Sequence, residues 1–591
     1  MKNFKYSKIS IITANARLAE DISKHFRKAG EYFPLFDVVD SPIPNKDSIM
    51  FGEFKNECTK IANSIKYLKS KKIILAECQK QIITEFKKHF PQDILLEVKK
   101  DDIDLISKLP GFKKTNNWNY SDLFRNEISD IIAIEYETGE NDLQLVIAKN
   151  LAAAENAKIV FLPNSHLDEV RMISDLFRDW MNSNDELERQ DNKKKIINII
   201  ENKIKNISFK EAKTISFITR GIPYGFFPFL CPTTHFFSHR LLGVQILLGM
   251  LKSTEPFLRC TSVYLCDPHE FDHSETQQLS NIFRSKSYVV KHAIGKNATV
   301  RDVRNSTQYL PIDLFFYSTH CGEIQGRRVK ERFTADDGVE HIICYDEVIE
   351  LAPKPGSEMA QVHHYNRWIS LDGIDWKDNA GKDRIDAGDL IDQYMKQVTN
   401  RTVDEAIASQ IEKKDIGIVK GSDALKMHDF IFIPIFHQVG GKCFPIVFNN
   451  TCSSWREFAV RFAIACASVY IGTSVDISNP VAIQVATKFS DKITKGITIG
   501  QALYIAQKEF IQKNGYCPYL MYGYLFTNFK PALPRMNNAN RFMNNLKSEL
   551  HSWKLFYSKT TLNELKVNAS DAISFLEEQL DNFIFSGKET Q

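Results

Sequence analysis

Two short runs of this chain each lead into a side chain that can take part in nucleophilic chemistry. The largely apolar and aromatic run 312–317 leads into His320, and the run 444–448 leads into Cys452. Runs of this length and composition are typical of strands buried on both faces of a parallel sheet. The carboxyl ends of such strands meet at one edge of the sheet, where ligands usually bind. We therefore expect His320 and Cys452 to lie in one crevice.

Strand-like and helix-like segments alternate along most of the sequence, which indicates an α/β fold with a mostly parallel sheet. The expected strands are 8–13, 72–75, 131–134, 159–162, 214–218, 262–265, 288–290, 312–317, 444–448 and 519–526. The expected helices include 16–29, 53–68, 142–154, 240–251, 276–283, 299–306, 458–470, 480–489 and 499–512. We interpret the aromatic stretch 224–230 as a loop that packs in the core or between domains, with a role in the substrate pocket as the alternative.

The length of 591 residues predicts more than one hydrophobic core. We expect an N-terminal α/β domain at 1–182, acting as a sensor or scaffold, and a linker helix at 183–209. A second α/β domain follows at 210–530, with a long insert at about 324–440. Residues 531–591 have apolar positions at helical spacing and predict a helical C-terminal tail.

The composition argues against several classes of function. The 76 basic and 73 acidic residues nearly balance, giving a net charge of +3, which provides no electrostatic reason for direct nucleic-acid or membrane binding. No stretch approaches 18 uninterrupted apolar residues, so no transmembrane span is expected. The apolar run 9–12 is too short for the core of a signal peptide. Eleven cysteines without framework spacing fit a reducing compartment, so we expect a cytoplasmic protein.

Neither a cofactor nor a metal is expected. Residues 13–17, in the first turn of the N-terminal domain, lack the glycines of a dinucleotide or phosphate-binding loop. A nucleotide-binding enzyme built on that domain is therefore disfavoured. His363 and His364 have no cysteine or carboxylate partners at ligand spacing, and we interpret them as part of a solvated loop.

Five motifs occur in order between residues 210 and 530. They are His320-Cys321-Gly322, Asn450-Thr451-Cys452-Ser453-Ser454, the small-residue stretch 463–468 before Gly472-Thr473, Gly496 to Leu503, and Leu525-Phe526. In type and order they resemble the caspase-like (clan CD) cysteine peptidases, and most closely the CHAT-domain group. Two departures stand out. The turn at Cys452 is not the Gln-Ala-Cys-x-Gly of caspases, and 132 positions separate His320 from Cys452, against roughly 50 in caspases.

The resemblance implies a caspase-like α/β/α sandwich with cysteine endopeptidase activity. Cys452 would be the nucleophile and His320 the general acid, with the backbone amides of Gly322 and Cys452 stabilising the oxyanion. Thr473 and Asp476 would lie at the substrate pocket, where an acidic side chain favours Lys or Arg before the cleaved bond. The implied partners are a protein substrate and an activating protein, in a regulated bacterial defence (antiviral) or cell-death setting.

Three alternatives stay open from the residues alone. The pair could be degenerate, which would leave a catalytically inactive scaffold that acts through protein binding. Asp476 could be a solvated turn residue rather than part of a pocket. Cys321 could be the nucleophile, although in an extended chain its side chain points away from that of His320.

Overall fold

The computed structural model describes residues 5–38, 49–99, 102–113, 130–136, 142–255, 258, 262–269, 272–353, 360–375, 390–391, 393–398, 401–419, 422–436, 438–529, 534–560 and 563–588. Its main feature is a ten-stranded sheet in the order β12-β11-β13-β22-β23-β24-β10-β9-β7-β8. The strands are β7 (Asp130–Glu135), β8 (Lys158–Leu162), β9 (Thr214–Thr219), β10 (Thr233–Phe237), β11 (Ser262–Asp267), β12 (Val289–Ile294), β13 (Leu314–Tyr317), β22 (Ile446–Asn449), β23 (Val469–Thr473) and β24 (Tyr519–Gly523).

All neighbouring pairs in this sheet are parallel except β23 with β24. The sheet therefore consists of two parallel halves that run in opposite directions and meet at that pair. The fold is α/β with a large, mostly parallel sheet, as the sequence predicts.

The side chains of the central strands alternate between two cores, because successive residues of a strand face opposite sides. Leu314 and Phe316 of β13 pack with the helices α9 (Ser274–Ser285), α15 (Asn479–Thr494) and α16 (Ile499–Asn514). Phe315 and Tyr317 pack with α10 (Val300–Tyr309) and α14 (Glu457–Ile464). This arrangement is a three-layer α/β/α sandwich.

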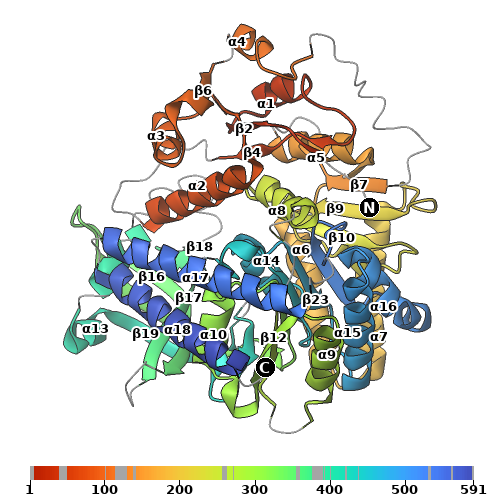
Figure 1. Cartoon of the computed structure of the whole chain (residues 1–591). Helices are drawn as coiled ribbons and strands as arrows, with labels where there is room; N and C mark the ends of the chain where they lie inside the picture. The colour runs from red at the N-terminus through yellow and green to blue at the C-terminus, as the bar shows by residue number, and fades with distance from the viewer. Residues whose placement is uncertain are drawn as a thin grey trace.

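A separate four-stranded parallel sheet, β4-β2-β5-β6, lies at the top of Figure 1. Its strands are β2 (Ile9–Thr13), β4 (Leu35–Asp37), β5 (Lys72–Ala76) and β6 (Leu95–Val98). Its helices include α1 (Ala16–Ser23), α2 (Ile49–Leu68), α3 (Lys80–His89) and α5 (Leu143–Glu155). It shares a core with α8 (Leu242–Thr254) of the larger unit. The sheets do not divide the chain at residue 182, because β7 and β8 join the ten-stranded sheet. The helices α6 (Leu167–Asn182) and α7 (Glu186–Ile204) connect β8 to β9.

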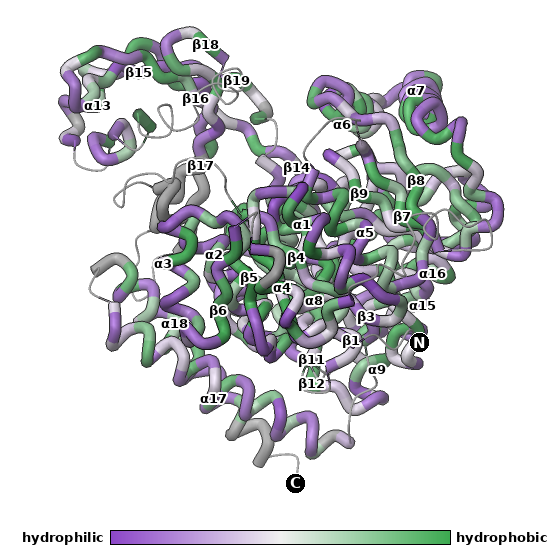
Figure 2. Tube along the Cα trace, turned by 90° about the horizontal axis from the view of Figure 1, so that it is seen from above, coloured by the Kyte–Doolittle hydropathy of each residue, from purple (hydrophilic) through white to green (hydrophobic). Residues whose placement is uncertain are grey.

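The expected insert begins and ends at a small three-stranded sheet, β14 (Cys321–Gly322), β20 (Ala424–Lys426) and β21 (Ile431–Phe432). Between them lies a five-stranded antiparallel sheet, β18-β17-β16-β15-β19, that projects from the body of the protein (Figure 2). It comprises β15 (Gln325–Thr334), β16 (Glu340–Pro353), β17 (Ala360–Leu371), β18 (Ile374–Asp375) and β19 (Gln410–Ile418), with the helix α13 (Val403–Ser409). The interpretation of His363 and His364 as a loop is wrong, since the backbone of both belongs to β17.

Two further sequence expectations are corrected. The segment 458–470 is not one helix, because α14 ends at Ile464, Cys466 has a positive φ of 68° that a helix cannot continue through, and β23 begins at Val469. The strand β10 lies directly after the aromatic stretch 224–230 and was not expected. Its aromatic side chains pack on neighbouring strands, as Phe237 does on Tyr522 with ring centroids 4.7 Å apart. Such packing depends on tertiary context that local pattern does not contain.

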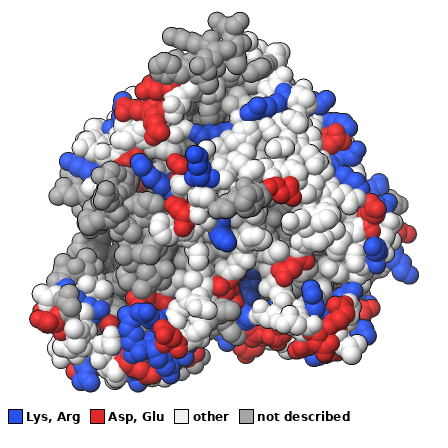
Figure 3. Space-filling model, turned by 90° about the horizontal axis from the view of Figure 1, so that it is seen from below, with Lys and Arg blue, Asp and Glu red and all other residues white. Residues whose placement is uncertain are grey.

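The chain ends in two long helices, α17 (Arg535–Lys559) and α18 (Asn563–Lys588), which lie side by side (Figure 1). In the coloured part of the face seen in Figure 3, acidic and basic side chains are interspersed. Within the described ranges, no helix is long and apolar enough to cross a membrane.

Candidate active site

The strands that lead to His320 and Cys452 are neighbours. β13 pairs with β22 in parallel, and Tyr317 lies opposite Asn449 in the register. His320 is three residues beyond Tyr317, and Cys452 is three residues beyond Asn449. The prediction of adjacent, parallel strands is confirmed. His320 and Cys452 each come three residues after a strand end at the same edge of the sheet.

The turn that carries Cys452 is held tightly by its surroundings. The hydroxyl of Ser454 donates to the carbonyl of Asn449 (3.0 Å), and the hydroxyl of Thr473 donates to the carbonyl of Thr451 (2.5 Å). Ser453 has a positive φ of 49°, a conformation that few non-glycine residues adopt. A Cβ atom at Gly472 would come within 2.9 Å of the backbone of Ser454. The turn therefore needs a glycine beside it and stores local backbone strain, as functional turns often do.

Thr473 belongs to this support rather than to a pocket wall. Its side chain is 1% exposed, and among the described residues it does not line the cavity beside Cys452.

One buried carboxylate links the two strand ends. Glu275, in the first turn of α9, accepts hydrogen bonds from the hydroxyl of Ser318 (2.5 Å) and from the side-chain amide of Asn450 (2.5 Å). The hydroxyl of Tyr519 in β24 donates to the other side of the Asn450 amide (2.5 Å). Burial raises the pKa of Glu275 to about 7. This network holds in place the two chain segments that lead from the strands to His320 and Cys452.

Cys452 lines a cavity of about 280 Å³ at this edge of the sheet. Five charged side chains line it as well: Arg178, Glu323, Asp423, Arg456 and Asp476. Gly322 and Cys321 also lie in the wall. The thiol of Cys321 donates to the backbone carbonyl of Cys452. The side chain of Cys321 therefore faces the Cys452 cavity, whereas His320 is not among the described lining residues.

The electrostatic surroundings of Cys452 favour the neutral thiol. Burial raises its pKa, and the nearby Asp476, whose carboxylate forms a hydrogen bond with the thiol, raises it further. The backbone amide of Ile477 acts in the opposite direction because it can donate to the sulfur. A thiol in this state is a weak nucleophile, since the thiolate is the reactive form.

His320 is exposed, and its imidazole packs edge-on against that of His269, with ring centroids 5.1 Å apart. Partial burial lowers the pKa of His320, and the positive charges of His269 and Lys426 lower it further. His269 is itself held by Asp267 at the end of β11 (2.8 Å), which raises the pKa of His269. These effects favour the neutral form of the His320 imidazole, which can accept a proton.

Four of the five charged residues of the cavity were not found by sequence reasoning: Arg178, Glu323, Asp423 and Arg456. Arg178 of α6 donates to both oxygens of Glu323 (2.8 and 3.0 Å). Burial, together with the charges of Glu323 and Glu457, raises the pKa of Asp423 to about 7. Arg178 precedes Cys452 by more than 270 positions, so no local pattern could have indicated that it shares a cavity with that cysteine. In the described part of the chain, no group of three or more His, Cys, Asp or Glu side chains is arranged to hold a metal ion.

No protein-family model matches the sequence, and no curated protein matches it. One solved structure with some similarity is the complex of the pro- and mature domains of RgpB from Porphyromonas gingivalis. It covers 68% of this chain and 80% of its own, with 8% identity and a TM-score of 0.34. A similarity of this size does not decide the fold, so the fold class depends on the sheet order and layers described above.

Proposed function

We propose that this protein is a cysteine endopeptidase in which Cys452 is the nucleophile and His320 the general acid and base. The observation that carries the proposal is the parallel pairing of β13 with β22. It brings the segments of His320 and Cys452 to one edge of the sheet, beside a cavity that Cys452 lines. The strained, firmly held turn at Ser453 supports it, because such turns are common at nucleophiles and ligand contacts.

In this mechanism the sulfur of Cys452 attacks the carbonyl carbon of the substrate, and His320 takes up the thiol proton. The amides of Gly322 and Cys452 would stabilise the oxyanion of the tetrahedral intermediate. The carbon–nitrogen bond then breaks, and His320 gives its proton to the leaving amine. Water hydrolyses the thioester that remains and regenerates the thiol.

The acidic side of the cavity favours a substrate with Lys or Arg before the cleaved bond. Asp476 and Asp423 both line the cavity, and Asp476 also interacts with the thiol of Cys452. A substrate cation paired with Asp476 would remove the effect of that carboxylate on the sulfur and lower the pKa of Cys452. Binding of the correct substrate would thus help to form the thiolate. A protein substrate, an activating protein partner and a regulated role in defence or cell death are parts of the same proposal.

The second candidate is an inactive scaffold of the same fold. Two observations favour it. The interaction with Asp476 raises the pKa of the Cys452 thiol and so disfavours the reactive thiolate. The His320 ring packs on His269, a contact that does not involve Cys452.

Fluorogenic peptides that differ only in the residue before the cleaved bond would decide between the two candidates. The peptidase hypothesis predicts cleavage after Arg or Lys. It also predicts that Cys452→Ala and His320→Ala each lower kcat by about 10³-fold or more. Cys321→Ser is the matched control and should retain activity, because a serine hydroxyl can still donate to the carbonyl of Cys452. Cleavage that survives in Cys452→Ala would exclude the mechanism. A folded wild-type protein that cleaves none of the peptides and no protein in a proteome-wide cleavage screen would favour the scaffold.

A further inference from the structure

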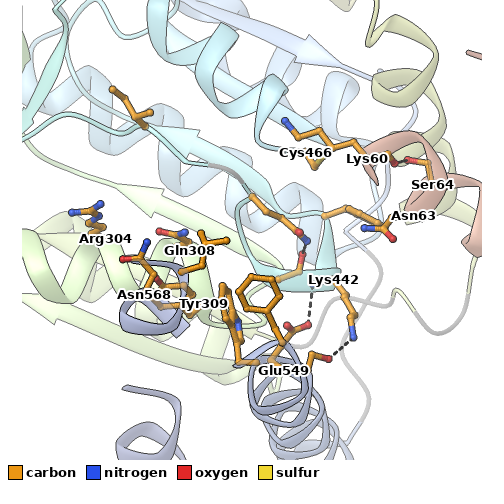
Figure 4. A pocket seen from close by; sticks show the side chains of 18 of the residues that line it. Lys60, Asn63, Ser64, Arg304, Gln308, Tyr309, Lys442, Cys466, Glu549 and Asn568 are labelled. Carbon is orange, nitrogen blue, oxygen red and sulfur yellow. Dashed lines mark hydrogen bonds between the residues drawn. The ribbon is translucent and has the colours of Figure 1, made fainter. Parts of the chain in front are cut away.

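A larger cavity, of about 990 Å³, lies between α2, α10, α17, α18 and the segment 432–444 (Figure 4). Phe444 and Cys466, which line it, come shortly before β22 and β23 respectively. The cavity is therefore at the amino ends of these strands, at the edge of the sheet opposite to Cys452. Its volume is in the range of small-molecule binding sites. Segments from both ends of the chain contribute to its walls.

Basic side chains outnumber acidic ones in the described lining of this cavity. Lys60, Lys66, Arg304 and Lys442 line it, against the single carboxylate of Glu549. Glu549 already accepts a hydrogen bond from the backbone amide of Lys442 (3.2 Å). The net charge of the cavity wall is therefore positive, which favours an anionic ligand.

Lys60 gives the most specific indication of an anion. Its side chain is 8% exposed, and it extends from α2 toward Cys466 in Figure 4. Among the described residues, its ammonium group has no hydrogen-bond acceptor and no carboxylate partner. Its positive charge acts on the thiol of Cys466, whose pKa is raised by burial and lowered in part by Lys60. The ammonium group lines the cavity without an anionic partner among the described residues, so an anionic ligand in the cavity could pair with it.

Aromatic rings and amides make up much of the remaining wall. Tyr309 meets Trp553 edge-to-face with centroids 5.2 Å apart, and Tyr67 meets Phe444 in the same way at 4.9 Å. Such rings bind flat, apolar groups by stacking or edge contacts. The side-chain amides that line the cavity are those of Asn63, Gln308, Gln438 and Asn568. Each amide offers both a donor and an acceptor, as the edges of a heterocyclic base require.

We propose that this cavity binds a nucleotide, with its phosphate at Lys60 and its base among the aromatic rings. Several cations suit a multiply charged phosphate better than the single charge of a fatty acid. The aromatic pairs and amides suit a base better than an alkyl chain. The site is distinct from the candidate active site and does not depend on the proposed peptidase activity.

Isothermal titration of the full-length protein with AMP, ATP, adenosine, inorganic phosphate and laurate tests this site. We expect AMP or ATP to bind, and adenosine and phosphate alone to bind at least about 10-fold more weakly, because each makes only part of the contacts. Lys60→Met keeps the apolar stem and removes the charge, so it should weaken nucleotide binding by about 10-fold or more. Lys55→Met, on the same helix but outside the cavity, is the control and should leave binding unchanged.

A second variant keeps the test independent of Lys60. Trp553→Leu removes a ring from the wall at a half-buried position of α17 and should weaken AMP binding while leaving phosphate binding unaffected. The proposal fails if neither AMP nor ATP binds at millimolar concentration. It also fails if binding is the same in Lys60→Met and wild type, or if laurate binds more tightly than the nucleotides, which would indicate a lipid site.

Discussion

Ser318 and Asn450 donate hydrogen bonds to the two oxygens of one buried carboxylate, that of Glu275. Ser318 precedes His320 by two residues, and Asn450 precedes Cys452 by two. A single helix residue therefore sets the relative position of the two segments on which the proposed chemistry depends. Neither strand pairing nor sequence motif identifies Glu275, which acts through these neighbours as a positioning residue.

Replacement of Glu275 by Leu should reduce both stability and activity. Each buried donor left without an acceptor costs about 1–3 kcal/mol of unfolding free energy. We expect kcat on an arginyl peptide to fall by about 10²-fold, as small misplacements of catalytic groups do, with KM nearly unchanged. Glu275→Gln keeps one acceptor and the side-chain shape, and should recover part of kcat. An active Glu275→Leu enzyme with wild-type kcat would remove the positioning role.

The raised pKa of Asp423 predicts a pH dependence of substrate binding. With a pKa of about 7, the carboxyl is largely neutral at pH 6 and ionised at pH 8. KM for an arginyl peptide should therefore fall as pH rises through 7, and this change should be absent in Asp423→Asn. KM for a peptide with a neutral side chain in the same position should not follow this trend.

The same group should affect stability in the opposite direction. Because the folded-state pKa lies above the ordinary value for aspartate, the unfolded chain loses its proton first, and stability falls as pH rises toward 7. Asp423→Asn should therefore be more stable than the wild type at pH 8 and nearly equal to it at pH 4. Urea unfolding at the two pH values measures this difference.

Two glycines near the site should respond differently to substitution. A Cβ atom at Gly322 would meet nothing within 4 Å, whereas one at Gly472 would come within 2.9 Å of the Ser454 and Trp455 backbone. Gly322→Ala should fold normally and lose activity only by obstructing the substrate. Gly472→Ala should lower the melting temperature because the turn at Cys452 must move. Equal melting temperatures for these two variants would show that the turn tolerates the change.

The sequence predicted the β13 and β22 strands and their adjacency, because continuous apolar runs identify buried parallel strands. It did not predict that Cys321 rather than His320 would face the cavity beside Cys452, since the direction of a side chain beyond a strand end depends on how the chain turns there. It does not separate β23 from α14, because the apolar residues of β23 closely follow the helical pattern of α14 and continue it. Glu275, Arg178 and Asp423 come from distant segments, and only the tertiary fold brings them to the site.

The projecting sheet of the insert can be tested by deletion, because the two chain segments that enter and leave it are hydrogen-bonded to each other where it joins the body. The amide of Val419 donates to the carbonyl of Ile324 (2.8 Å), and the hydrophobic core that contains Val329 and Tyr345 is separate from the cores of the body. A variant in which two glycines replace residues 325–418 tests the insert, and it also removes Val348, which packs on Val419 and Ile433 at the base. If the insert gates access or binds a partner, cleavage of short peptides should stay within about threefold of wild type, and cleavage of a protein substrate should change by about tenfold or more. Wild-type cleavage of both peptides and proteins by a folded deletion variant would show that the insert neither gates the site nor recruits a partner.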